Sequence, residues 1–331
     1  MNNVVTELSE WIREYGHDPR HQERLLSVRF NWHQLWTALD VIEDIELAIS
    51  AYETGEFPTD PGEQYLRVYG LLQALFVQGY ALEHFVKAIR PGMSINGKDL
   101  FKEIRENRNA AIGHPTELGH KKGQLSTHLI SRISMRKEGF DLMSFSESKG
   151  DAAIRYVTVR DLIEKQRTEM VRIMGDVVTH LKEEDAAHKA TFRTKSLKQA
   201  FHLVPYAFEK ISEEMRAGSV AILGAWAAGE LQSALRVFEQ LLKERGLSIE
   251  TYDAVRYTYK DIEYPLAQLQ MFLAKRKSDI PHSEAARVYA DALQGAFSHL
   301  MDIAEEIDEE YSNEDQTEAA GSISDPAGSQ T

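Results

Sequence analysis

Apolar residues recur every three to four positions along most of the chain, a pattern typical of helices that bury one face. This period predicts an amphipathic helix at residues 2–15 and a long second helix at residues 20–52. A third helix is expected at residues 60–90, because Asp60 can cap its first turn and Pro61 fits the first helical position.

The third helix carries two apolar stripes. The first comprises Tyr65, Val68, Leu72, Leu75, Leu82, Val86 and Ile89. The second comprises Leu66, Tyr69, Phe76 and Tyr80. Because a helix that is apolar on two faces tends to bury both, we expect it in the middle of a helical bundle.

The next helix, within residues 98–117, is short and carries two arginines near its apolar side. Its apolar face is formed by Leu100, Phe101, Ile104 and Ala111. Arg105 and Arg108 lie close to that face, and a partly buried arginine requires an anionic partner. Gly113 and Pro115 predict the end of this helix.

Beyond residue 125 the apolar pattern changes to the alternation typical of strands. Strands are predicted at residues 126–135, 139–145 and 153–159. We interpret them as a small antiparallel sheet inserted between the third and fourth helices of the bundle. A helix at residues 161–188 is expected to close that bundle.

The C-terminal half returns to the helical period and predicts a second bundle. Its four expected helices cover residues 197–216, 220–244, 249–277 and 283–311. The predicted fold class is therefore mainly α: a helical bundle with a small antiparallel β insert, followed by a second helical bundle. The predicted domains are residues 1–193 with the insert at about 125–160, residues 194–311, and a disordered acidic tail at 312–331.

Composition limits where the protein acts. The chain of 331 residues has no cysteine, which excludes disulfides and thiolate metal sites and fits a reducing cytoplasm. Its N-terminal segment carries Glu7, Glu10 and Glu14 instead of a basic and then apolar run, so we expect no signal peptide. The longest apolar stretches are far shorter than the roughly 20 residues of a membrane span. We therefore expect a soluble, cytoplasmic protein with no membrane partner.

The charge is unevenly distributed. A formal net charge of −14 argues against a nucleic-acid partner. However, residues 302–325 hold ten acidic residues and no lysine or arginine, whereas residues 87–137 hold eleven basic residues and four acidic ones. The local potential around the short helix can thus attract an anion. Alternatively, these basic side chains are ordinary solvated residues on the surface and bind no anion.

The string from Arg108 through Asn109 to His114, followed by Pro-Thr, resembles the Arg-x4-6-His signature of the HEPN superfamily. These helical domains occur in many prokaryotic ribonucleases and toxins. The preceding helix also resembles the long central HEPN helix, so the likeness covers roughly residues 60–117. The first predicted domain is accordingly HEPN-like.

The chemistry of RNA cleavage by transesterification suits these three residues. His114 can act as general acid or base near neutral pH. Arg108 can hold the nonbridging phosphate oxygens, and Asn109 can orient the phosphate or the histidine. On a straight α-helix Arg108 and His114 lie about 120° apart around the axis and about 9 Å along it. Either the helix bends at Gly113 or a two-fold dimer supplies a second pair.

The resemblance implies a metal-independent endoribonuclease without cofactors, acting as a toxin or an antiviral defence effector. It also implies a homodimer in which both motifs line one cleft, an RNA or nucleotide ligand, and an antitoxin or regulatory protein as a further partner. No metal ligand set is evident in the sequence. Further candidates for substrate binding are Arg105, Lys121, Lys122 and His128.

Several alternatives remain open. Arg108 could pair with Glu103 or Glu106, and His114 could cap the end of the helix. The domain could bind RNA or a nucleotide without cleaving it. The chain could also be a structural helical interaction protein whose motif is accidental.

Overall fold

The computed structural model describes residues 2–25, 29–90, 95, 98–116, 118–119, 125–146, 149–217 and 222–312. The chain forms two compact units, residues 1–181 and 182–331. The boundary falls within one long helix, α6 (Val159–Phe192), whereas the sequence analysis placed it just after residue 193.

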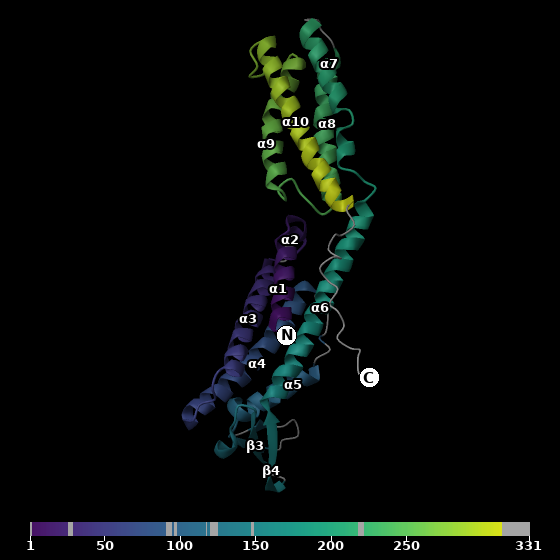
Figure 1. The fold of residues 1–331 in the computed structure, drawn as a ribbon. Coiled ribbons are helices and arrows are strands. Elements are labelled where there is room, and N and C mark those ends of the chain that lie inside the picture. Colours follow the sequence, from purple (N-terminus) through teal and green to yellow (C-terminus); the bar gives the residue numbers. More distant parts are fainter. Residues whose placement is uncertain are drawn as a thin grey trace, which may run out of the picture. The chain divides into compact units, whose positions relative to one another are not determined.

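Helices make up most of the first unit (Figure 1). They are α1 (Asn2–His17), α2 (Pro19–Leu25), α3 (Arg29–Thr54), α4 (Pro61–Ile89), α5 (Lys98–Arg108) and the first part of α6. The single helix expected at residues 20–52 is described as α2 and α3, and residues 26–28 lie outside the described residues. The start of α4 is as predicted, because the Asp60 side chain accepts a 3.0 Å hydrogen bond from the Glu63 N–H.

Most of the first apolar stripe of α4 is buried as expected, with Leu72 and Leu75 fully enclosed. The prediction for the second stripe is wrong in part, because Leu66 is 73 % exposed and Tyr80 is 54 % exposed. A hydrophobic pattern indicates what a helix can bury, whereas burial also requires a neighbouring element to cover that face. As a result, α4 keeps an open apolar face.

A small antiparallel sheet follows α5, with strand order β1-β2-β3-β4. The strands are β1 (Leu118–Gly119), β2 (Leu125–Ile130), β3 (Gly139–Ser146) and β4 (Lys149–Thr158). The first predicted strand, at residues 126–135, is too long. The chain leaves β2 after Ile130 and forms a 3-10 turn at Arg132–Ser134, where the Ser134 hydroxyl accepts a 2.8 Å hydrogen bond from the Asp141 N–H.

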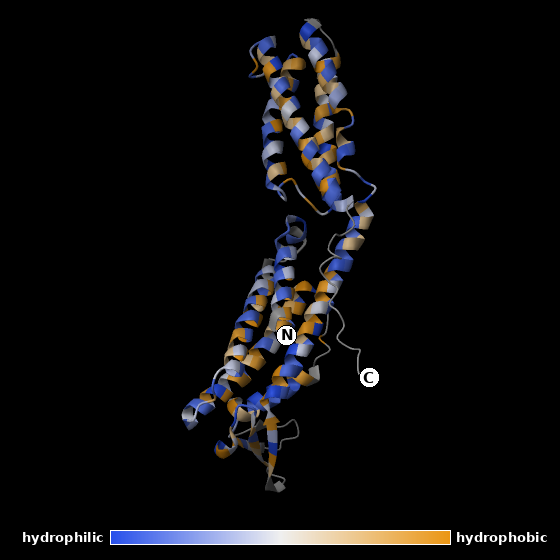
Figure 2. Ribbon diagram, in the orientation of Figure 1, coloured by the Kyte–Doolittle hydropathy of each residue, from blue (hydrophilic) through white to orange (hydrophobic). Residues whose placement is uncertain are grey.

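The long elements of the second unit are all helices, and they lie side by side in Figure 1. They are α7 (Val204–Ala217), α8 (Ile222–Glu244), α9 (Asp253–Leu273) and α10 (Ser283–Ser312). Figure 2 shows apolar residues recurring along each of these helices, and those residues form one continuous core. The predicted fold class, mainly α with a small antiparallel sheet, is therefore confirmed.

Two predicted helices of the second unit begin later than expected. The segment at residues 197–216 contains a 3-10 turn, Lys198–Phe201, before α7. Pro205 explains the late start, because proline lacks an N–H group and fits only the first turn of a helix. α9 begins at Asp253 because the Ser248 N–H donates to the Thr251 hydroxyl at 2.8 Å and closes a turn.

The predicted acidic tail lies almost entirely outside the described residues. Ser312 is the last residue of α10, and the description ends there. None of the described helices has a stretch long and apolar enough to cross a membrane.

Candidate functional site

The HEPN-like motif lies where α5 changes its hydrogen-bond pattern. After Arg108 the helix continues as one π-helical turn, Asn109–Gly113. The His114 N–H donates a 2.8 Å hydrogen bond to the Asn109 carbonyl and ends the turn. The sequence predicted an end at Gly113, but the π turn was not predicted. Such turns are frequent at functional sites.

The guanidinium of Arg108 is held by uncharged groups. Its Nε donates a 3.0 Å hydrogen bond to the Gln73 side-chain oxygen on α4, and its Nη1 donates one of 3.0 Å to the Asn109 side-chain oxygen. Its Cζ lies 5.0 Å from the centre of the Phe76 ring. A Cβ added at Gly113 would come within 2.9 Å of Nη1, so the guanidinium also lies against the Gly113 backbone.

No described carboxylate pairs with Arg108. Glu103 pairs with Lys165 of α6 at 3.8 Å, and Glu106 pairs with Lys102 at 3.9 Å. The alternative ion pairs of Arg108 with these two glutamates are therefore not found. A half-buried guanidinium whose contacts with the described residues are all neutral is well suited to binding an external anion.

His114 is exposed at the end of the π turn. Its backbone N–H makes the capping hydrogen bond, while its imidazole has no hydrogen-bond or ion-pair partner in the part of the chain that the structure describes. Because the Arg108 guanidinium contacts Gly113 and His114 is the next residue, the guanidinium lies at the end of the helix that carries His114.

The further candidates have different surroundings. Arg105 lies one turn before Arg108, and its Cζ is 6.0 Å from the same Phe76 ring. The His128 N–H on β2 donates a 2.6 Å hydrogen bond to the carbonyl of Pro115, the residue after His114. Lys121 and Lys122 lie outside the described residues.

The ring of His128 is held within the sheet. One ring nitrogen lies 3.0 Å from the Ser126 hydroxyl, and the other lies 2.8 Å from the Ser144 hydroxyl. The backbone of His128 therefore supports the turn after the motif, while its imidazole is occupied by serines of β2 and β3.

The sequence analysis missed Gln73 and did not anticipate that Phe76 would contact Arg108. Gln73 was not noticed, and Phe76, which was assigned to a buried stripe, is half-buried; both contact Arg108 of α5. Their spacing of three residues places them next to each other on a helix and was visible in the sequence. No local pattern indicated that α5 would pack there.

Comparisons of the chain with protein-family models, with curated proteins and with solved structures found no match. The resemblance to HEPN proteins therefore stays a prediction from the sequence.

Among the described residues, no three His, Asp or Glu side chains are grouped so that they could hold a metal ion.

Proposed function

We propose that the chain is a metal-independent endoribonuclease of the HEPN type. The observation that supports this most directly is the environment of the Arg108 guanidinium. It is fixed by Gln73 and Asn109, has no described carboxylate partner, and lies against the residue that precedes His114. A fixed cation at the end of the helix that also carries an exposed histidine suits a phosphodiester substrate.

In the proposed reaction the 2′-hydroxyl of RNA attacks the neighbouring phosphorus and gives its proton to a general base. The bond from phosphorus to the 5′-oxygen breaks as the bond to the 2′-oxygen forms, and the leaving oxygen takes a proton from a general acid. Arg108 binds the nonbridging oxygens, whose negative charge increases in the phosphorane. The products are a 2′,3′-cyclic phosphate and a 5′-hydroxyl.

His114 supplies one of the two proton transfers. Because the His128 ring is engaged by Ser126 and Ser144, we assign the other transfer to the partner subunit's His114 in a homodimer. The resemblance of the motif to that of HEPN proteins supports a role as a cytoplasmic toxin or antiviral defence effector, with an antitoxin or regulatory protein as its partner.

A noncatalytic module that binds RNA or a nucleotide is the second candidate. It is favoured by one observation: Arg108 is oriented by two hydrogen bonds, whereas no described residue orients the imidazole of His114. Such a site is well prepared to bind an anion and less well prepared to transfer a proton.

The experiment incubates the purified chain with a long single-stranded RNA in EDTA and identifies the ends of any products. The proposal predicts fragments with 5′-hydroxyl ends and cyclic or 3′-phosphate ends. The His114→Ala chain, purified in parallel, controls for contaminating nucleases. Binding without cleavage would favour the second candidate, and the absence of both would overturn both candidates.

A further inference from the structure

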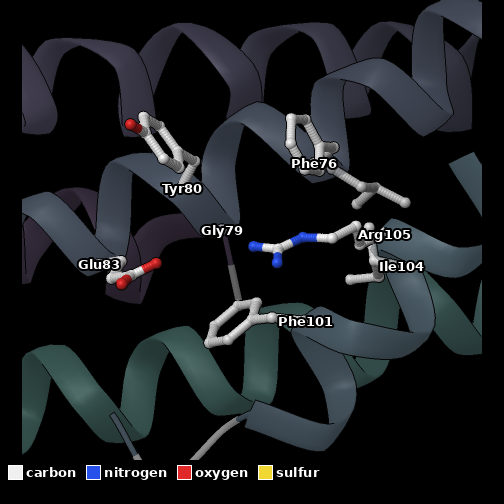
Figure 3. A pocket seen from close by; sticks show the side chains of 8 residues that line it. Phe76, Gly79, Tyr80, Glu83, Phe101, Ile104 and Arg105 are labelled. Carbon is white, nitrogen blue, oxygen red and sulfur yellow. The ribbon is translucent and has the colours of Figure 1, made fainter. Parts of the chain in front are cut away.

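The space between α4 and α5 is too small for a nucleobase. The pocket there has a free volume of about 20 Å³, which is room for about one water molecule. Figure 3 shows the Arg105 side chain itself between Phe76 and Tyr80 on one side and Phe101 on the other. An RNA strand whose phosphate is held by Arg108 therefore places its neighbouring nucleotides on another surface.

The small sheet begins directly beside the motif. The His128 N–H of β2 donates a 2.6 Å hydrogen bond to the carbonyl of Pro115, so the residue after His114 lies alongside β2 as a neighbouring strand does. β1 continues this pairing, and β3 and β4 follow β2 in order. Because neighbouring strands are about 4.8 Å apart, β4 lies only about 15 Å from Pro115.

The sheet has one buried face and one outer face. Ile130 and Leu142 are buried in the core of the first unit. The side chains that alternate with them belong to the outer face, where Leu129 pairs with Met143 and Met143 pairs with Ile154. Four large side chains of this face are between 40 % and 62 % exposed: Leu129, Phe145, Ile154 and Tyr156. Because the solvent-facing side of an antiparallel sheet is usually polar, an apolar outer face indicates an interaction surface.

Two aromatic rings lie on the outer face. In the strand register Tyr156 is opposite Asp141, and Phe145 lies four residues further along β3, a separation of about 14 Å. Gly139 leaves room for the tyrosine, because an added Cβ there would be 2.9 Å from the Tyr156 Cζ. Exposed rings of this kind stack on the bases of single-stranded RNA.

Unpaired positive charge lies beside this face. Arg136, in the turn before β3, donates hydrogen bonds to the backbone carbonyls of Ile133 and Met135 and pairs with no described carboxylate. Arg155 is exposed on β4 and likewise has no carboxylate partner in the part of the chain that the structure describes. Among the described side chains of β2, β3 and β4, the one carboxylate is that of Asp141. This balance of charge favours a polyanion as the ligand.

We propose that the outer face binds the nucleotides of a single-stranded RNA that flank the phosphate held by Arg108. Its residues are Leu129, Met143, Phe145, Ile154 and Tyr156. Bases stack on the two rings and cover the apolar row between them, and the neighbouring arginines bind phosphates. Because every base has a face that can stack, the surface binds single strands without a sequence preference. The inference rests on the proposed RNA-binding function.

The test measures the affinity of a fluorescently labelled strand of about ten uridines by anisotropy, using the His114→Ala chain so that the RNA stays intact. Tyr156→Ala removes one ring, and Phe145→Leu replaces the other by an apolar side chain that cannot stack. Each change is expected to weaken binding about tenfold, whereas Tyr156→Phe keeps the ring and should stay within about twofold. The matched control is Tyr257→Ala, which removes a tyrosine that is 60 % exposed on α9 of the second unit.

Unchanged affinity in Tyr156→Ala and Phe145→Leu, or an equal loss in Tyr257→Ala, would overturn the inference. It would also be overturned if Tyr156→Ala abolished self-association in sedimentation experiments and left RNA affinity intact, because the face would then be a protein interface.

The outcome is separable from the proposed function. Binding that depends on the rings, in a chain that never cleaves RNA, would retain the outer face as an RNA site and exclude the ribonuclease. Cleavage by a chain whose RNA affinity is insensitive to both rings would retain the ribonuclease and exclude this site.

Discussion

The guanidinium of Arg108 lies where a side chain at Gly113 would have to be. A Cβ at Gly113 would come within 2.9 Å of the Arg108 Nη1 and 3.2 Å of the Asn109 side-chain oxygen. The backbone of Gly113 is not in the left-handed region, so this glycine matters for the space that it leaves to the guanidinium and not for its conformation. The position of the proposed phosphate-binding group therefore depends on this glycine.

Gly113→Ala is expected to displace the guanidinium and to slow RNA cleavage by about tenfold to a hundredfold. Its free energy of unfolding should not fall, because alanine is compatible with this backbone and restricts the unfolded chain. Single-turnover cleavage and urea denaturation measure the two effects. Gly70→Ala on α4 is the control, because no atom lies within 4 Å of its added Cβ. Full activity in Gly113→Ala would contradict this account of Arg108.

A buried ion network stabilises the first unit. Arg167 of α6 donates hydrogen bonds of 3.0 Å to Glu46 and 2.9 Å to Glu53, and the side chains of Arg167 and Glu46 are only 7 % and 10 % exposed. Arg167→Met is expected to destabilise this unit by about 3–5 kcal/mol, because the Glu46 carboxylate is left buried without its cationic partner. Urea denaturation followed by circular dichroism measures the loss.

The control for this network is Arg172→Met on the same helix. Arg172 also binds two carboxylates, but its side chain is 43 % exposed. Its replacement should cost less than about 1 kcal/mol, because solvent screens surface ion pairs. Similar losses in the two variants would show that burial does not determine the contribution of the network.

Asp308 connects α10 to the segment before α7. It accepts hydrogen bonds from the Leu197 N–H at 2.9 Å, the Ser196 hydroxyl at 2.6 Å and the Arg245 guanidinium at 2.7 Å. Burial raises the pKa of Asp308, but these hydrogen bonds outweigh burial and hold its pKa below 3.8. Because the pKa is lower in the folded state, the stabilisation is complete above the unfolded pKa, about pH 4, and is lost as the pH falls through the folded pKa.

Asp308→Asn is therefore expected to lower the stability of the second unit at pH 7 by about 1–3 kcal/mol. The variant should also lose less stability than the wild type when the pH is lowered below about 4. Urea denaturation at a series of pH values tests both effects. The exposed residue Asp302, on the same helix, supplies the control Asp302→Asn. Parallel pH curves for the wild type and Asp308→Asn would refute the assignment.

Much of the fold could be predicted from the sequence because most helices bury a single face. The helix expected at residues 283–311 is found at Ser283–Ser312, since its apolar residues recur with the helical period. The π turn after Arg108 could not be predicted, because no residue type in that turn specifies one. The open face of α4 was also missed, since the apolar character of Tyr80 does not reveal whether another element covers it.

The candidate site was only partly accessible to sequence reasoning. The spacing of Arg108 and His114 indicated where to look, and their role in catalysis stays a prediction. The contact between Arg108 and Gln73 joins α5 to a residue of α4 that lies 35 positions earlier in the chain. Such contacts depend on how helices pack, which the local pattern of one sequence does not specify.

The central claim is that Arg108 and His114 act together on one phosphodiester. The most direct test compares single-turnover RNA cleavage in EDTA by the wild type, Arg108→Ala, His114→Ala and the double variant. Arg132→Ala removes an exposed arginine from the same basic stretch and serves as the control. We predict that each site variant is at least about 100-fold slower than the wild type, and that the double variant is little slower than the singles. Cleavage by either site variant at the wild-type rate would contradict the account.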